Sequence, residues 1–300
     1  MYTLDQLRGF VAVAEEGHFV RAAERLNMTQ PPLSRQIQKL EQQVGVELLR
    51  RTSRATVLTP AGRAFLDDAR KILSLAAAAP LHARRITDGS EGTVKMAFTA
   101  TAALSFLGPW AQMATVGLPN VDLVLSELVS GAQIDALLAV EIDLGLVREV
   151  PRSETLNSRL VHNESLLLAV PDGHPLTRVT NPNVQDVANY DVVTYDHFGA
   201  HYFFELIVSV FRDAGARPRY TQYVSQVSSV LALVSGGLGV AFVPEGIKVL
   251  KLPNMRFIRV SGVRANCVEL YCVWKTGNEN PALTSLLALA ASEGFLPSFP

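Results

Sequence analysis

Cysteine is scarce in this chain, because only Cys267 and Cys272 occur among its 300 residues. Two cysteines are too few for the disulfide framework of a small secreted domain. They lie five positions apart in a predicted strand, so their side chains should face opposite sides of a sheet and could not pair. We therefore expect both of them to be small residues of the core.

The sequence also lacks any apolar run of the roughly 18 to 20 residues that a helix needs to cross a bilayer. Its beginning, Met1-Tyr2-Thr3-Leu4-Asp5-Gln6-Leu7-Arg8, has no apolar core behind a basic end, which is unlike a secretory signal peptide. We expect a cytoplasmic protein with no membrane partner. Its 300 residues exceed one typical core and suggest two or three domains.

The chain as a whole has no excess of positive charge, because its net charge is -1. The distribution is uneven, however. Residues 1–90 hold 13 Lys and Arg against 9 Asp and Glu, a net of +4, whereas residues 91–300 hold 14 against 19, a net of -5. This asymmetry is consistent with a basic nucleic-acid-binding part joined to an acidic body.

Familiar catalytic and metal-binding patterns are absent as well. No Gly-x-Ser-x-Gly elbow appears, and neither cysteine has a basic neighbour that would make it a nucleophile. His197 and His201 are four residues apart, but no glutamate stands between them as in a metalloprotease motif. We expect no catalytic residue, no metal site, no cofactor and no enzymatic activity.

The stretch from Phe19 to Glu41 is predicted to form two helices joined by a tight turn. Apolar residues recur at helical spacing in both halves, at Ala22, Ala23, Leu26, Leu33, Ile37 and Leu40. Thr29 is a suitable N-cap for the second helix, and prolines are tolerated in a first turn. The outer face of that helix carries amide, hydroxyl and cationic groups, which can contact the edges of bases in DNA. The alternative is an ordinary helix pair with a solvated face.

A basic hairpin is predicted directly after this helix pair. Residues 46–50 and 55–58 read as two short strands, with Arg50, Arg51 and Arg54 at or beside the tip. Such a hairpin is a wing, whose arginines would reach phosphates or the minor groove. Three arginines in five positions favour contacts with the DNA backbone over a merely solvated turn.

A long helix is predicted from Thr59-Pro60, a strong helix start, to about Thr87. An apolar stripe on a helix that no domain surrounds needs a partner, most simply a second copy of the chain. Pro80 should kink or break the helix. Residues 88–92 form the linker to the body.

The body shows alternating strands and helices from residue 93 onward. Strands predicted at 93–98, 121–125 and 142–147, with helices between them, indicate a parallel sheet covered by helices. Ligands in such sheets bind outside the carboxyl ends of the strands. Those ends are followed here by residues 99–101, 127–130 and 147–148.

A second alternating unit follows between residues 192 and 243, and a strand at 267–274 and a helix at 282–291 close the chain. Two α/β halves that the chain joins twice would leave a cleft between them. Gly236-Gly237-Leu238-Gly239 comes after a helix and before a strand, so we expect a helix end and turn rather than a phosphate loop.

Taken together, these segments resemble the LysR-type transcriptional regulators, and the resemblance covers the whole chain. It rests on segments that share the order and spacing of that family, namely Ala22-Ala23-Glu24-Arg25-Leu26, Thr29-Gln30-Pro31-Pro32-Leu33-Ser34-Arg35-Gln36-Ile37, Leu40-Glu41, Gly45-Val46-Glu47-Leu48-Leu49-Arg50-Arg51 and Leu58-Thr59-Pro60-Ala61-Gly62. The fold that it implies is an α+β winged helix-turn-helix domain, a long linker helix and an α/β two-lobed effector domain like a type 2 periplasmic binding protein.

The resemblance also implies domain boundaries and partners. We expect a DNA-binding domain at 1–58, a dimerising linker helix at 59–90 and an effector-binding domain at 91–300. In the effector-binding domain, lobe I would span about 91–161 and 266–300, and lobe II about 162–265. The implied partners are promoter or operator DNA, a small organic acid effector, RNA polymerase as a candidate, and further copies of the chain in a homodimer that assembles into a homotetramer.

Named residues would contact DNA under this interpretation. Bases would be contacted by Gln30, Arg35 and the surface of Pro31 and Pro32, at the start of the helix that Thr29 begins. Phosphates would be contacted by Ser34, Lys39, Arg51 and Arg54. A dimer would place two such helices in successive major grooves, roughly 34 Å apart.

The body is similar to members of the family that respond to aromatic acids or their ring-cleavage products. That similarity rests on Phe98, Glu127-Leu128, Ala132-Gln133, Gly145, Arg148, Phe203, Phe211, Asp213, Gly215, Pro218, Val227, Leu231-Ala232-Leu233 and Val243-Pro244. The effector contacts that it implies are Thr99, Thr101, Ser130, Arg148, His201, Phe203 and Val227. A guanidinium and hydroxyls suit a carboxylate, and the apolar side chains form a wall.

Alternatives stay open at this point. Arg148 could instead form a salt bridge with Glu149 or Asp196. The body could be a small-ligand-binding or enzymatic α/β domain with an accessory helical domain. A solute-binding protein that serves a transporter is a third reading, but it would need export. The interpretation that we adopt is a regulator whose effector controls DNA bending, and thereby activation or repression.

Overall fold

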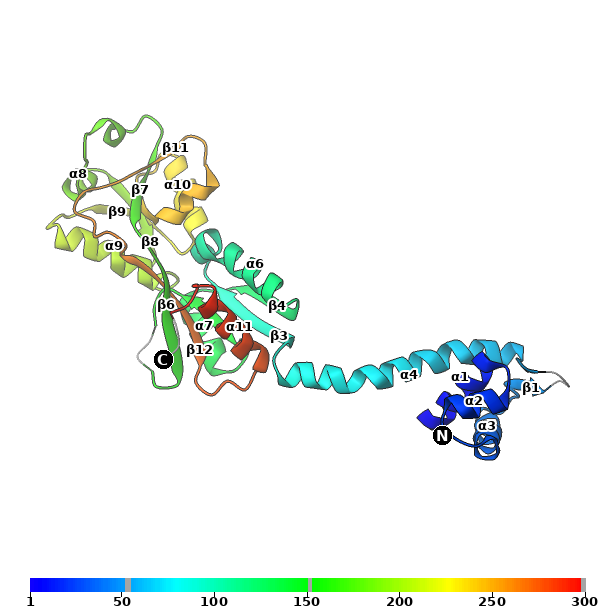
Figure 1. Ribbon diagram of the computed structural model, residues 1–300. Helices are drawn as coiled ribbons and strands as arrows, with labels where there is room; N and C mark the ends of the chain where they lie inside the picture. Colours follow the sequence, from blue (N-terminus) through cyan, green and yellow to red (C-terminus); the bar gives the residue numbers. More distant parts are fainter. Residues whose placement is uncertain (52–54, 151–152, 298–300) are drawn as a thin grey trace. The chain divides into compact units, whose positions relative to one another are not determined.

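A computed structural model describes residues 1–51, 55–150 and 153–297 (Figure 1). The chain divides into two compact units, an N-terminal unit, Met1–Arg85, and a C-terminal unit, Ile86–Pro300. Among the described residues, no helix is both long and apolar enough to cross a membrane. The finer boundaries predicted at residues 58 and 90 stay predictions.

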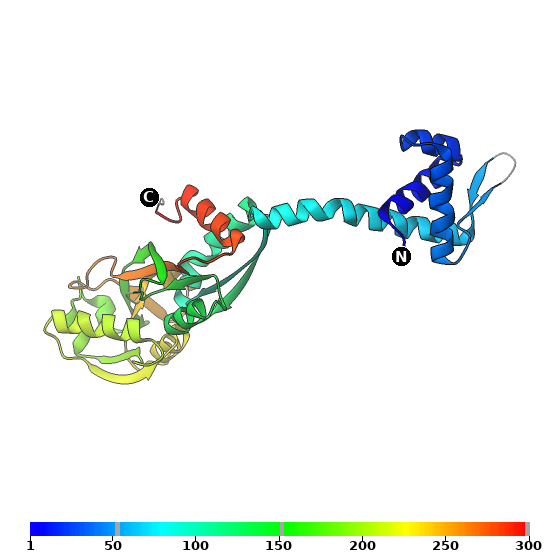
Figure 2. The ribbon, with the colours of Figure 1, turned by 90° about the horizontal axis from the view of Figure 1, so that it is seen from below.

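The N-terminal unit is built on three short helices, α1 (Leu4–Glu16), α2 (Phe19–Arg25) and α3 (Gln30–Val44). Figure 2 shows them gathered around the first part of α4 (Pro60–Thr87). Their apolar faces meet in one core, in which Leu7, Phe10, Val13, Ala22, Leu33, Leu40 and Leu48 are fully buried. The predicted helix pair is confirmed.

Thr29 occupies the predicted N-cap position of α3, but its side chain makes no capping hydrogen bond. A capping oxygen normally accepts from the backbone N–H of the second or third helical residue. In α3 these residues are Pro31 and Pro32, which carry no backbone N–H. The exposed Thr29 is therefore available for other contacts.

The hairpin pairs β1 (Leu49–Arg51) with β2 (Thr56–Leu58) in antiparallel register. The first strand begins later than the predicted residue 46, because Glu41 of α3 holds the preceding backbone. Its Oε1 accepts hydrogen bonds from the N–H groups of Leu48 and Leu49, at 2.8 and 3.0 Å. Arg51 is consequently part of a strand, while Arg54 lies outside the described residues.

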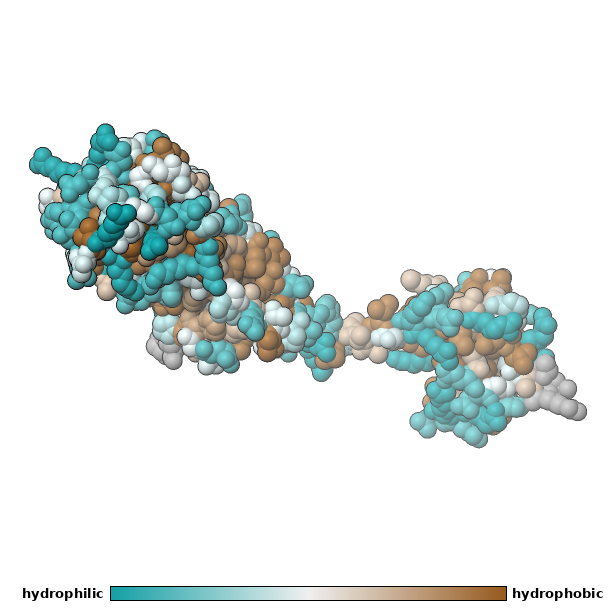
Figure 3. Space-filling view, turned by 90° about the horizontal axis from the view of Figure 1, so that it is seen from above, coloured by the Kyte–Doolittle hydropathy of each residue, from teal (hydrophilic) through white to brown (hydrophobic). Residues whose placement is uncertain are grey.

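Helix α4 starts as predicted, since the Thr59 hydroxyl accepts a hydrogen bond from the N–H of Gly62 at 2.9 Å. It runs without a break through Pro80, so the predicted alternative of a broken helix is wrong. One proline removes a single backbone hydrogen bond, and water can satisfy the carbonyl that is left because residues 77–88 are exposed. This part of the helix exposes Leu81 and Ile86, and Figure 3 shows brown and beige atoms along it.

Lobe I of the C-terminal unit is a five-stranded sheet in the order β4-β3-β5-β12-β6. Its strands are β3 (Glu91–Phe98), β4 (Asn120–Glu127), β5 (Leu144–Val147), β6 (Leu156–Glu164) and β12 (Val268–Lys275). The first three are parallel to one another, as predicted, whereas β12 runs antiparallel to both β5 and β6. Its helical segments are α5 (Ala100–Ala102), the π-helical η1 (Ala103–Leu107), α6 (Gly108–Gly117), α7 (Ser130–Leu138) and α11 (Pro281–Ser292).

Lobe II contains a sheet in the order β10-β7-β11 and a parallel pair, β8-β9. Its strands are β7 (Leu166–Pro171), β8 (Asp191–Tyr195), β9 (Arg219–Val224), β10 (Ala241–Pro244) and β11 (Met255–Ile258). Its helical segments are η2 (Pro175–Arg178), α8 (Val184–Ala188), α9 (His201–Asp213), α10 (Val227–Ser235) and η3 (Glu245–Leu250). Four of these elements were not predicted from the sequence because they are too short for a clear periodicity, namely η2, α8, η3 and β11.

The chain passes between the lobes twice, as predicted. The first crossing, at Ser165, separates β6 from β7, and the second leads from β11 into β12 (Figure 1). The two crossings contact each other, because the N–H of Asn266 donates to Ser165 Oγ at 3.1 Å. Cys267 and Cys272 near the second crossing are buried and unpaired with each other, which confirms that prediction.

The predicted helix end and turn after α10 are also confirmed. Gly236 is the C-cap of this helix. Gly237 and Gly239 have positive φ values of 77° and 143°, a conformation that glycine adopts without a steric penalty. The segment is therefore a helix end and turn and does not have the strand-to-helix order of a dinucleotide fingerprint.

We predict that the N-terminal unit loses stability in acid through Glu15. Arg70 of α4 and Arg25 of α2 donate to this carboxylate at 2.7 and 2.8 Å, and these hydrogen bonds hold the pKa of Glu15 below its ordinary value of 4.5. A depressed pKa stabilises the fold above the unfolded value, and the contribution disappears as the pH falls through the folded value. Glu15→Gln should therefore cost up to about 1 kcal/mol at pH 7.

Chemical unfolding at several pH values checks this prediction. The difference between wild type and Glu15→Gln should be smaller at pH 3 than at pH 7. Glu24→Gln removes an exposed carboxylate of α2 and should have little effect at either pH. A difference for Glu15→Gln that stays constant between pH 7 and pH 3 would contradict the assignment.

Candidate functional site

A cleft of about 530 Å³ lies between the two lobes of the C-terminal unit. All three strand-end segments predicted from the sequence contribute to its wall from lobe I, and α9 and α10 contribute from lobe II. Each predicted effector contact lines this cleft, namely Thr99, Thr101, Ser130, Arg148, His201, Phe203 and Val227. Their roles in binding stay a prediction, but the fold brings them together.

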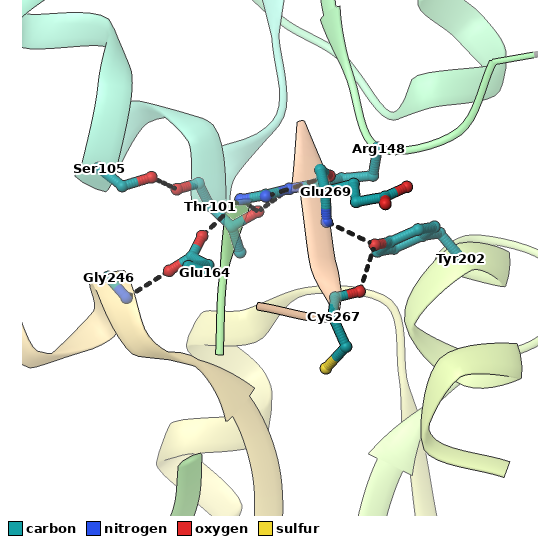
Figure 4. Close-up of polar contacts among 8 residues, drawn as sticks. All are labelled: Thr101, Ser105, Arg148, Glu164, Tyr202, Gly246, Cys267 and Glu269. Carbon is teal, nitrogen blue, oxygen red and sulfur yellow. Dashed lines mark hydrogen bonds and ion pairs between the residues drawn. The ribbon is translucent and has the colours of Figure 1, made fainter. Parts of the chain in front are cut away.

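Arg148 is the central cation of the cleft and is only 2% exposed. Its guanidinium donates to Thr101 Oγ1 from Nε and Nη2 at 3.3 and 3.1 Å, and to the Glu269 carbonyl from Nη1 at 3.3 Å (Figure 4). Its backbone N–H donates to Ser130 Oγ at 3.0 Å. Two predicted hydroxyl contacts, Thr101 and Ser130, therefore position Arg148 directly.

The ion-pair partner of Arg148 is Glu164, which sequence analysis did not single out as a site residue. Nη2 lies 3.1 Å from Glu164 Oε1, and the second carboxylate oxygen accepts from the N–H of Gly246 at 2.6 Å (Figure 4). Glu164 is 6% exposed. The sequence feature that could have identified Glu164 is a polar interruption between two apolar strands, at the point where the chain leaves lobe I.

The two partners considered from the sequence do not pair with Arg148. Glu149 follows it on the exposed side of the strand end, while Asp196 accepts hydrogen bonds from the N–H groups of Phe198 and Gly199, both at 2.8 Å. Burial lowers the pKa of Arg148, and the adjacent Glu164 carboxylate opposes that shift. Arginine nevertheless remains charged in proteins, so the buried pair is a guanidinium and a carboxylate.

Lobe II presents an aromatic wall to the cleft. Tyr195 at the end of β8 stacks on Phe203 of α9, with ring centroids 4.8 Å apart and planes at 24°. The guanidinium carbon of Arg148 lies 5.9 Å from the Phe203 ring centroid. Helix α9 is anchored to the second crossing by the Tyr202 hydroxyl, which donates to the Cys267 carbonyl and accepts from the N–H of Glu269 (Figure 4).

Two hydroxyls of the cleft are buried without a hydrogen-bond partner among the described residues, Thr99 Oγ1 from lobe I and Tyr195 Oη from lobe II. Such orphaned polar groups are rare in proteins and need an explanation. Burial raises the pKa of Tyr195, so its hydroxyl remains a donor at neutral pH. Tyr195 was not predicted as a site residue, because the segment around it has the pattern of an ordinary core strand.

The charges of the cleft are arranged with the cation inside and the anions outside. Glu127, Asp135 and Glu149 line the cleft but are exposed, whereas Arg148 is buried. Water screens exposed charges far more than buried ones. The inner part of the cleft consequently offers hydroxyl and N–H donors beside an aromatic wall.

The outer face of α3 forms the second candidate site. Gln30, Pro31, Arg35 and Lys39 are exposed, and Pro32 and Ser34 are partly exposed, while the opposite face of the helix is in the core. Arg51 of β1 donates to Ser34 Oγ at 2.7 Å, and its guanidinium carbon lies 4.4 Å from the Phe19 ring centroid. The structure thus joins the wing to the start of α3, although Arg54 lies outside the described residues.

These two sites define a class of protein, a DNA-binding helix-turn-helix unit linked to a two-lobed ligand-binding unit. Residues 4–63 match the family model described as a bacterial regulatory helix-turn-helix protein of the lysR family, and residues 87–294 match the LysR substrate binding domain. The chain belongs to the LysR family of transcriptional regulators, and it is a regulator rather than an enzyme.

Individual relatives match over almost the whole chain. The uncharacterized HTH-type transcriptional regulator YnfL of Escherichia coli (strain K12) is 37% identical, over 93% of this chain and 94% of that protein. The HTH-type transcriptional regulator ClcR of Pseudomonas putida is 33% identical, over 95% and 96%. The crystal structure of full-length CbnR complexed with its target DNA has a TM-score of 0.81 at 29% identity, covering 97% of this chain and 99% of that one.

We predict that Glu164→Gln strongly destabilises the C-terminal unit. The change leaves the buried Arg148 guanidinium without its counter-charge, and removing one partner of a buried ion pair typically costs about 3–5 kcal/mol. Urea unfolding of the full chain measures the loss. The matched control is Glu245→Gln, which removes a carboxylate paired with the exposed Arg259 and should cost at most about 1 kcal/mol. Equal losses for the two variants would contradict the prediction.

Proposed function

We propose that the cleft between the lobes binds a small organic carboxylic acid, aromatic or derived from an aromatic ring, and that this effector controls how the regulator acts on DNA. The observation that carries the proposal is the pair of buried hydroxyls of Thr99 and Tyr195, one from each lobe, for which the described residues supply no hydrogen-bond partner. A carboxylate can accept a hydrogen bond from each of them. The adjacent aromatic wall of Tyr195 and Phe203 suits an apolar ring.

Arg148 would support such a ligand through one remaining donor. A guanidinium has five N–H groups, and four of those of Arg148 are used within the described residues, by Thr101, Glu164 and Glu269. The remaining Nη1–H can donate to a ligand oxygen. Because Glu164 already neutralises the guanidinium, Arg148 contributes a directed hydrogen bond more than an unpaired charge.

The effector would act by shifting a conformational equilibrium. A ligand that contacts both lobes stabilises the arrangement in which they are close, and it shifts the population only by its difference in affinity for the two arrangements. Transmission to DNA would pass through assembly of the chain. Helix α4 exposes Leu75, Leu81 and Ile86, which favours pairing with a second copy, and the family resemblance suggests a tetramer of two such dimers that bends promoter DNA and contacts RNA polymerase.

In the N-terminal unit, α3 would enter the major groove of the operator. Gln30 and Arg35, with the surface of Thr29, Pro31 and Pro32, would contact base edges. Ser34, Lys39, Arg51 and Arg54 would contact phosphates. The hydrogen bond from Arg51 to Ser34 would hold both groups in place before DNA arrives.

We predict different DNA-binding defects for Arg35→Ala and Lys39→Ala. Arg35→Ala removes a proposed base contact and should cost about 1–3 kcal/mol of discrimination between a selected operator and random duplex. Lys39→Ala removes a proposed phosphate contact. It should weaken binding to both duplexes alike and lower the slope of log affinity against log salt concentration by about one. Lys71→Ala, which removes an exposed lysine of α4, is the control and should change neither quantity.

Fluorescence anisotropy at several salt concentrations provides the measurement. The operator is selected from a random pool with the wild-type protein. If Arg35→Ala retained both affinity and sequence preference at fixed salt, its role in contacting bases would be refuted.

We predict that carboxylic acids bind the cleft through its orphaned hydroxyls. In calorimetric titrations with benzoate and cis,cis-muconate, at least one acid should bind, and neutral benzamide should bind more weakly than benzoate. Thr99→Val and Tyr195→Phe should each lower the affinity about five- to tenfold, the equivalent of one hydrogen bond. The matched control is Thr194→Val, which removes a buried hydroxyl that has no hydrogen-bond partner within the described ranges and lies outside the cleft lining, and it should leave affinity unchanged.

Two results would contradict this proposal in different ways. Equal binding of benzoate and benzamide would show that the cleft does not recognise the carboxylate of the ligand. Unchanged affinity in both Thr99→Val and Tyr195→Phe would reject the two hydroxyls as contacts of the ligand.

A further inference from the structure

Three metal-ligating side chains meet where α9 begins. His197 Nδ1 lies 3.3 Å from His201 Nδ1 and 3.8 Å from Glu205 Oε1. The three ligand atoms all lie within 4.8 Å of one another. About half of the His197 and Glu205 side chains is exposed, at 51% and 52%, so an ion could reach them from solvent.

The distances suit one divalent transition-metal ion. Two histidine nitrogens that bind zinc tetrahedrally at about 2.0–2.1 Å lie about 3.3–3.4 Å from each other, which matches the His197 and His201 nitrogens. The Glu205 oxygen lies 3.8 Å from His197 Nδ1 and would have to move closer to bind the same ion, which a half-exposed side chain can do by rotation. Two imidazoles and one carboxylate favour zinc and similar ions, whereas calcium and magnesium prefer oxygen ligands alone.

The backbone before α9 holds this arrangement in place. Asp196 accepts from the N–H groups of Phe198 and Gly199 through its side chain, and its carbonyl accepts from the N–H of Ala200 at 3.1 Å. This turn folds His197 back over the first turn of the helix, where His201 and Glu205 lie one turn apart. A Cβ at Gly199 would lie only 2.7 Å from Ser225 Cβ, so the close turn requires glycine.

Aromatic side chains flank the same turn. The His197 ring makes edge contacts with the Phe198 and Phe204 rings, whose centroids lie 5.5 and 5.3 Å away. His201 also lines the cleft between the lobes, whereas His197 and Glu205 do not. The three side chains therefore share one residue with the cleft but form a separate cluster beside it.

We propose that His197, His201 and Glu205 form a binding site for one divalent transition-metal ion of the zinc class, with a coordination position left open to water. No metal site was predicted from the sequence, because no glutamate stands between the two histidines. The third ligand instead comes from the next turn of α9, on the carboxyl side of His201. The rival interpretation is a metal-free pair of histidines that share a hydrogen bond.

Zinc binding to the full chain without an affinity tag tests this proposal. Competition with a zinc-sensitive chelator should show one ion per chain, and Co²⁺ in its place should give visible absorption bands. His197→Ala and Glu205→Gln should each lower zinc affinity at least about tenfold. His82→Ala, which removes an exposed histidine of α4, should leave it unchanged.

Circular dichroism shows whether the variants stay folded, and neither His197 nor Glu205 is buried. Absence of bound zinc would overturn the proposal, as would affinities that are equal in wild type and both ligand variants. Because the titration contains no effector and no DNA, its result is independent of the function proposed for the cleft.

Discussion

The buried ion pair between Arg148 and Glu164 is the interaction on which the C-terminal unit depends. It links the end of β5 to the end of β6, and Glu164 extends the link to the backbone of Gly246 in lobe II. Separating the lobes would break the hydrogen bond from the N–H of Gly246 to Glu164, and leaving a buried carboxylate oxygen without its donor is costly. The pair therefore couples the geometry of the cleft to the geometry of the crossing between the lobes.

This coupling explains why one side chain can serve both structure and binding. Thr101, Ser130 and Glu164 hold Arg148 from different elements, so its position is set before any ligand arrives. Preorganised donors cost little to immobilise on binding. The hydroxyls of Thr99 and Tyr195, in contrast, have no partner within the described residues and are the polar groups that a ligand would satisfy.

Elements that depend on local periodicity were predicted correctly from the sequence, whereas features that depend on contacts between elements were not. Helical spacing in residues 30–40 predicted α3 correctly, because its buried residues Leu33, Ile37 and Leu40 follow from periodicity alone. The beginning of β1 was predicted three residues early, since the side chain of Glu41 in α3 binds the backbone of Leu48 and Leu49. The ion-pair partner of Arg148 was missed for the same reason, as no local pattern relates residues 148 and 164.

The sequence by itself determined the family, the helix-turn-helix unit and the strand ends that line the cleft, because these depend on short-range periodicity and on motif spacing. Only the tertiary structure decided which side chains meet. It paired Arg148 with Glu164, left the Tyr195 hydroxyl without a hydrogen-bond partner in the part of the chain that the structure describes, and brought Glu205 to His197. Such contacts depend on how strands and turns are placed in space, and an amino-acid sequence read in short windows contains no distance between remote residues.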